Sequence, residues 1–171
     1  TLAITAKAKK LKAEGKSIIG FTAGEPDFDS PEIVKSSAHH AIDIGFTKYT
    51  PASGMPELKS AICEKLKNEN GLDYKPSQIV VSSGAKSSLY HAILAIVNPD
   101  DEVIIPTPFW LTYEEQVKLA GGKCVFVDTS NDGYKLNEKL FRENITEKTK
   151  AVIINSPSNP TGAVYTEEEL K

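Results

Sequence analysis

The second half of the chain alternates short apolar runs with helical patterns, and this alternation constrains the fold more than any other feature. The runs are continuous and rich in Val and Ile, as is typical of strands that are covered on both faces. The apolar runs are residues 79–81, 103–105, 124–127 and 151–154. The helical patterns are residues 84–97, 109–119 and 136–143, and a further one begins at Thr166. Strands joined by helical crossovers pair in parallel, so the sequence predicts an α/β domain with a mostly parallel sheet and helices on both faces.

The first half contains helical patterns without strands. An Ala/Lys/Leu-rich stretch at the start predicts one helix that ends near Gly15. A second helix is predicted to begin at residues 30–32, with the Ser30 hydroxyl as its cap, and to end at Gly45. A third is predicted from Pro56 until Gly71 stops it.

The two ends of the sequence indicate a piece of a longer protein. The chain opens without Met, inside a helical pattern. Near the other end, Thr166 and Glu169 have the spacing of a capping box, which starts a helix, yet the sequence stops at Lys171. A helix of fewer than two turns cannot bury a useful apolar face. Helix nucleation is also costly, so such a short helix would not be stable. We therefore expect further sequence to follow.

Composition argues against several classes of protein. Hydrophobic residues make up 40% and charged residues 25% of the chain, close to the globular average. No apolar run approaches the roughly 20 residues of a membrane helix, and a net charge of -3 gives no general attraction for nucleic acid. Cys63 and Cys124 fall in apolar patterns and are expected to be free thiols, and the histidines lack metal-ligand spacing. We expect a cytoplasmic protein without metal, nucleic-acid or membrane partners.

Polar, conformationally restricted segments follow three of the predicted strands, where ligands collect in parallel sheets. Residues 82–88 place Ser, Gly and Lys at a helix start, which suits a phosphate, although a solvated Ser-rich cap has the same pattern. Trp110 follows a proline-stiffened strand exit and is placed to stack on a flat ligand, although packing in the core is the commoner use. Asn159 lies in the stiff segment 155–162, for which a tight turn without a ligand is the alternative.

These segments match one family in order and spacing across nearly the whole chain. The matching residues are 23–28, 48–49 with Gly54 and Leu58, 83–86, 108–110 and 155–162. Together they resemble the fold-type I pyridoxal-phosphate aminotransferases, and within them the prokaryotic-type aspartate/aromatic branch. Segment 155–162 is quite specific by itself, and the combination is very specific.

The resemblance implies a role for each matching residue of the cofactor site. It implies that Gly84, Ala85 and Lys86 supply the cradle for the cofactor phosphate. It implies that Trp110 stacks on the pyridine ring. Asn159 is implied to bind the phenolic oxygen of the ring and to help hold the substrate carboxylate. The physical properties agree, since such a site must clamp the phosphate and orient the ring.

Three further residues acquire roles only through the resemblance. Gly24 is implied to contact the substrate carboxylate through its backbone. Tyr49 is implied to reach the phosphate of the neighbouring subunit's cofactor, which predicts a homodimer. Thr1 aligns near a segment that contacts the distal end of the substrate.

The resemblance also implies the architecture and the reaction. It predicts a three-layer large domain in part, with residues 1–30 as an N-terminal arm and connecting segment of the small domain. Residues 31–171 would form the N-terminal portion of the large cofactor-binding domain. The whole protein would transfer an amino group from aspartate, or a related amino acid, to 2-oxoglutarate. The family's Schiff-base Lys, its pyridine-nitrogen Asp and its α-carboxylate Arg all fall beyond Lys171, so we expect this chain alone to be inactive.

Three other interpretations stay open on sequence alone. A lyase or synthase of the same fold would use a similar site. A non-catalytic fragment would bind no cofactor. An unrelated nucleotide-binding α/β domain would bind phosphate at 83–86 without needing Trp110 or Asn159.

Overall fold

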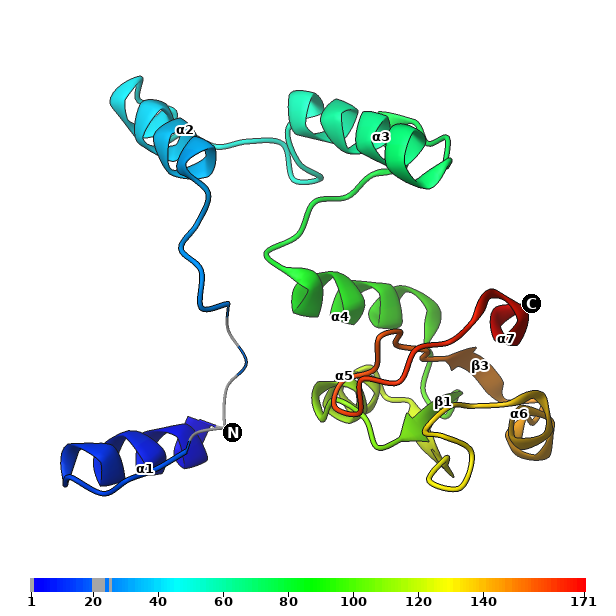
Figure 1. Ribbon diagram of the computed structural model, residues 1–171. Coiled ribbons are helices and arrows are strands. Elements are labelled where there is room, and N and C mark those ends of the chain that lie inside the picture. The colour runs from blue at the N-terminus through cyan, green and yellow to red at the C-terminus, as the bar shows by residue number, and fades with distance from the viewer. Residues whose placement is uncertain (1, 20–23, 25) are drawn as a thin grey trace. The chain divides into compact units, whose positions relative to one another are not determined.

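The computed structural model describes residues 2–19, 24 and 26–171. The chain divides into two compact units, Thr1–Tyr49 and Thr50–Lys171, each of which is described by itself. Figure 1 shows their helices and strands. The predicted boundary at residue 30 concerns the domains of the whole protein and stays a prediction. Within the described part, no helix has the length and apolar composition needed to span a membrane.

The first unit contains two helices, α1 (Leu2–Ala13) and α2 (Glu32–Asp43). Gly15 follows α1 with a φ of 78°, in the left-handed region that favours glycine, so the predicted stop is confirmed. The predicted Ser30 cap is wrong. Pro31 occupies the N-cap position of α2 without a side-chain bond, and the Ser30 amide instead donates to Asp29 Oδ1 at 2.9 Å.

The second unit opens with α3 (Pro56–Asn70), which has Pro at its first position and left-handed Gly71 at its end, as predicted. A short 3₁₀ turn, η1 (Pro76–Gln78), and helix α4 (Ala85–Ile96) follow. The strand predicted at 79–81 does not form. A strand requires a neighbour for its backbone groups, and this segment pairs with none of the three described strands. The Val81 amide instead donates to the Ser53 carbonyl at 3.0 Å.

Three parallel strands form the sheet, in the order β2-β1-β3, and helices connect them as the sequence predicts. The strands are β1 (Glu102–Thr107), β2 (Lys123–Asp128) and β3 (Thr149–Val152). The helices are α5 (Thr112–Leu119), α6 (Glu138–Asn144) and α7 (Glu167–Leu170). Helix α5 begins three residues later than expected, because residues 108–110 form the non-helical segment that follows β1. The capping box of α7 forms as predicted, with both reciprocal bonds present.

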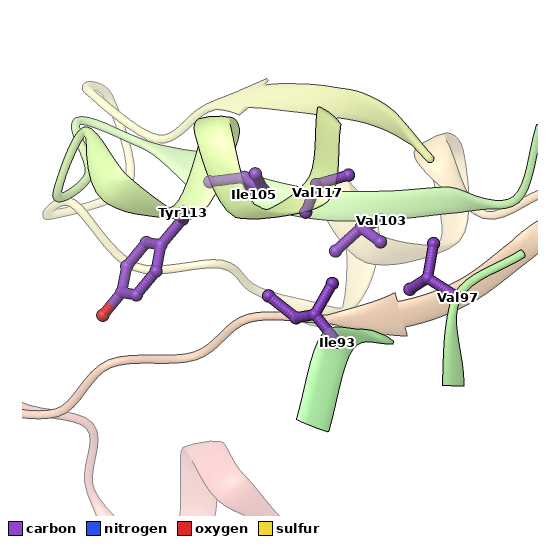
Figure 2. Close-up of a cluster of buried hydrophobic side chains, with 6 residues drawn as sticks. All are labelled: Ile93, Val97, Val103, Ile105, Tyr113 and Val117. Carbon is purple, nitrogen blue, oxygen red and sulfur yellow. The ribbon is translucent and has the colours of Figure 1, made fainter. Parts of the chain in front are cut away.

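The central strand β1 sends alternate side chains into two separate apolar clusters. Val103 and Ile105 lie with α4 and α5 residues on one face, as Figure 2 shows. Ile104 lies on the other face with Val127 and Leu136, against which residues of α6 pack. All three β1 side chains are fully buried. Helices therefore cover both faces of the sheet, and the predicted α/β class is confirmed.

Candidate functional site

A cleft lies at the carboxyl ends of β1 and β3, the edge where parallel sheets bind ligands. Residues from the exits of both strands line it, together with three tyrosines from other segments. The lining residues are Ile105, Pro106, Pro108, Phe109, Tyr113, Tyr134, Ile153, Ile154, Asn155, Ser158, Asn159 and Tyr165. Two of the three predicted polar segments therefore meet at one place.

The third polar segment forms the start of α4. Gly84 is the N-cap, with φ 82° and ψ 163°, a conformation that a residue with a side chain rarely adopts. Gly84, Ala85 and Lys86 are all exposed, and a Cβ on Gly84 would meet no atom within 4 Å. Because the first amides of a helix have no intrahelical acceptor, this turn offers an open, electropositive site for an anion.

Lys86 and Trp110 come together although they are far apart in sequence. The Lys86 ammonium lies 5.3 Å from the centre of the Trp110 ring, within the range of a cation–π contact. The Trp110 ring packs edge-on against Tyr113, with the two centres 5.4 Å apart. Since Tyr113 lines the cleft, these contacts connect the α4 start to the strand-end cleft. Burial raises the pKa of the Tyr113 hydroxyl above its ordinary value, so this group stays neutral near neutral pH.

Residues of β2 and its following turn hold the exit of β1. Thr129 is 1% exposed, and its hydroxyl donates to the Thr107 carbonyl at 2.7 Å. The Phe109 and Phe126 rings stack with centres 5.1 Å apart and an interplanar angle of 6°. The path from β1 to Trp110 is thus fixed by contacts with residues 17 or more positions away.

Short-range hydrogen bonds hold the exit of β3. The Asn159 backbone amide donates to Asn155 Oδ1 at 2.8 Å, and the Gly162 backbone amide donates to the Ser158 carbonyl at 2.8 Å. The peptide bonds before Pro157 and Pro160 are cis. The Asn159 side chain is exposed and makes no hydrogen bond to the part of the chain that the structure describes, so its amide is available to a ligand.

Comparison with known proteins identifies the family. The family described as aminotransferase class I and II matches residues 16–171. The chain belongs to this family. The resemblance drawn from the sequence motifs is therefore confirmed.

The chain is similar to relatives of the aspartate branch. It is 56% identical over its whole length to an aspartate aminotransferase of Bacillus sp. (strain YM-2), and 55% identical to one of Bacillus subtilis. It covers 44% of each relative, so the chain spans less than half of the proteins it matches. A solved aspartate aminotransferase of Thermus thermophilus with maleate superposes with a TM-score of 0.94 at 46% identity, covering 99% of this chain and 44% of that one.

The remaining predicted site residues lie in the first unit of the chain. Tyr49 and Gly24 are exposed, and Gly24 has open space around its Cα. Thr1 lies outside the described residues, as do residues 20–23 and Glu25 of the motif around Gly24. Their implied contacts with substrate and with a neighbouring subunit stay predictions.

Sequence reasoning missed several residues that build the site. Tyr165 is buried, and its hydroxyl accepts a 2.6 Å bond from the Leu136 amide. Gln116 is 4% exposed and donates to the Lys86 carbonyl at 2.8 Å. Tyr134 adopts a φ of 61°, which is uncommon for a residue with a side chain, and it borders the cleft. The one signal in the sequence is Gln116 itself, a polar residue at an apolar helical position.

Among residues 2–19, 24 and 26–171, the structure contains no group of three or more His, Cys, Asp or Glu side chains that could hold a metal ion. Cys63 and Cys124 are free and half-buried. Burial raises the pKa of the Cys124 thiol, which makes it a poor nucleophile at neutral pH.

Proposed function

We propose that this chain supplies the phosphate-binding and ring-binding groups of a pyridoxal-phosphate site. The whole protein would be a cytoplasmic aminotransferase that moves an amino group from aspartate or a related amino acid to 2-oxoglutarate. One observation carries the proposal. The ammonium of Lys86, at the open start of α4, lies 5.3 Å from the ring centre of Trp110, the only Trp in the sequence. A phosphate bound at the helix start and a ring stacked on Trp110 would belong to one ligand.

The residues present suit that cofactor. The exposed amides at the start of α4 and the Lys86 ammonium would neutralise the phosphate. Trp110 would cover one face of the pyridine ring, and the free side-chain amide of Asn159 would bind the phenolic oxygen. When bound, the cofactor supplies an electron sink for the bond that is broken in the substrate. The protein residues named here bind and orient it.

The remaining assignments extend the proposal to the whole protein. Gly24 would contact the substrate carboxylate through its backbone. Tyr49, fully exposed in this chain, would reach the cofactor phosphate of a second subunit, so the protein would act as a homodimer. No lysine of this chain is assigned to hold the cofactor covalently, and Lys86 would remain a charged group beside the phosphate.

The test is a titration of the chain with pyridoxal phosphate, in which binding is measured by the quenching of Trp110 fluorescence. We expect Asn159→Ala to weaken binding about tenfold, equivalent to one lost hydrogen bond of about 1.4 kcal/mol. Asn131→Ala, an exposed Asn outside the cleft, serves as the matched control and should leave the affinity unchanged.

Equal affinity of Asn159→Ala and the wild type would contradict the proposal. Tight binding of inorganic phosphate without quenching by pyridoxal phosphate would also contradict it, because the phosphate site and Trp110 would then not serve one ligand.

A further inference from the structure

The start of α4 lacks a cap of its own. Its N-cap residue is Gly84, which has no side chain and makes no capping bond. Residues 83–86, at the start of the helix, are exposed. An uncapped helix start frays readily, because its first turn has few intrahelical bonds. A turn that binds phosphate with preorganised amides therefore needs support from outside the helix.

Gln116 of α5 provides that support. Its Nε2 donates to the Lys86 carbonyl, in the first turn of α4, at 2.8 Å across 30 residues of sequence. The Lys86 side chain at the same time lies over Trp110, two residues before α5 begins. Lys86 is thus held twice by one segment of chain, through its carbonyl and through its ammonium.

A contribution to packing alone explains Gln116 poorly. Its neighbours Tyr113 and Val117 lie in the apolar cluster of Figure 2, and Gln116 itself is 4% exposed. Its Oε1 is buried and has no donor in the part of the chain that the structure describes. A half-satisfied buried amide costs free energy that an apolar side chain of the same size would avoid. The bond to Lys86 therefore orients the first turn of α4 and does not add net stability.

We infer that Gln116 is a positioning residue, which fixes the phosphate-binding turn of α4 relative to the ring-stacking Trp110. This inference rests on the proposed function, because it assigns the two linked parts to one cofactor. The link would make the phosphate and ring sites a single preorganised unit, so that a ligand does not have to order the helix start when it binds.

The first experiment needs no ligand. Hydrogen exchange of the full chain, measured by mass spectrometry, compares Gln116→Met with Val117→Ala. Gln116→Met keeps the volume but removes the donor, whereas Val117→Ala opens a cavity one residue away and keeps the bond. We expect the hydrogen-bonded amides of residues 87–90 to exchange at least about tenfold faster in Gln116→Met than in Val117→Ala, because local protection is lost. Gln116→His, whose ring N–H can donate in place of Nε2, should restore the slow exchange.

The second experiment separates the two sites by ligand. Tryptophan quenching gives the affinity for pyridoxal phosphate and for pyridoxal, which lacks the phosphate. We expect Gln116→Met to lower the affinity for pyridoxal phosphate about tenfold and to change the affinity for pyridoxal by less than about twofold. Val117→Ala should change the ratio of the two affinities by less than about twofold.

The two experiments test the positioning role of Gln116 and the proposed function separately. Equal exchange at residues 87–90 in Gln116→Met and Val117→Ala would overturn the positioning role, as would an unchanged affinity ratio in Gln116→Met. A wild-type chain that binds neither pyridoxal phosphate nor pyridoxal would overturn the proposed function. The exchange experiment would still show whether Gln116 holds the turn.

Discussion

The two strand exits that line the cleft are held in different ways. Contacts with distant residues hold the exit of β1: the Thr129 hydroxyl bonds the Thr107 carbonyl, and Phe109 stacks on Phe126. From residue 155 on, near-neighbour bonds hold the exit of β3, such as the bond from the Asn159 backbone amide to Asn155 Oδ1. One side of the site therefore depends on the packed core, and the other depends on its own sequence.

This difference separates stability from binding. A change at the β1 exit should disturb the core and the site together. A change within segment 155–162 should alter the site while the sheet stays folded, because the hydrogen bonds described for this segment join residues between 155 and 165. Matched substitutions on the two sides test that contrast.

The largest expected effect comes from one isoleucine on each side of the cleft. Ile105 is fully buried on β1, whereas Ile154, just after β3, is 45% exposed. Ile105→Ala should lower the free energy of unfolding by about 2–5 kcal/mol, since it leaves a cavity in a packed cluster. Ile154→Ala should cost less than about 1 kcal/mol. Urea unfolding of both variants measures the difference, and equal losses would break the contrast.

A smaller effect is expected from one threonine on each side. Thr129→Val keeps the shape but removes the bond to Thr107, and should cost about 1–2 kcal/mol because the bond is buried. Thr161→Val removes a local bond of 3.2 Å from the Ala163 amide and should cost about 0.5 kcal/mol or less. Thermal or urea unfolding compares them. A larger loss in Thr161→Val would show that the β3 exit is the more tightly coupled side.

The smallest effect concerns pH and the helix after the β3 exit. The Lys135 ammonium, followed by the Thr166 amide, bonds Glu169 and holds the pKa of this carboxyl below its ordinary value. A lowered folded-state pKa gives stability that is present above the unfolded pKa and is lost as pH falls through the folded pKa.

The check for this effect is unfolding of the wild type and of Glu169→Gln from neutral to acid pH. We expect the wild type to be the more stable at neutral pH and the two to converge in acid. A difference that does not change with pH would rule out the ion pair as its source.

The sequence predicts the local features of the fold better than the long-range ones. Helix α3 is predictable because local residues mark both ends: Pro56 is its first residue, and Gly71 follows its last. The prediction of a strand at 79–81 is wrong, because an apolar pattern carries no information about whether a pairing strand is present. The Ser30 cap fails for a similar reason: the chain before α2 turns so that Asp29 takes the Ser30 amide.

The same distinction applies to the site. The family motifs are enough to indicate Lys86, Trp110 and Asn159. Their surroundings are not predictable in this way, since the bond from Gln116 to Lys86 joins residues 30 positions apart. No local pattern specifies such a contact, although a Gln inside an apolar helical face marks a place to look.

The most direct test of the account is borohydride reduction of the chain in the presence of pyridoxal phosphate, with the label mapped by peptide analysis. We predict reversible binding that quenches Trp110, with no lysine of residues 1–171 labelled stoichiometrically. In a longer protein that contains this chain, we predict one labelled lysine beyond Lys171. Stoichiometric label at a single lysine within residues 1–171 would contradict the account and would make this chain a complete site.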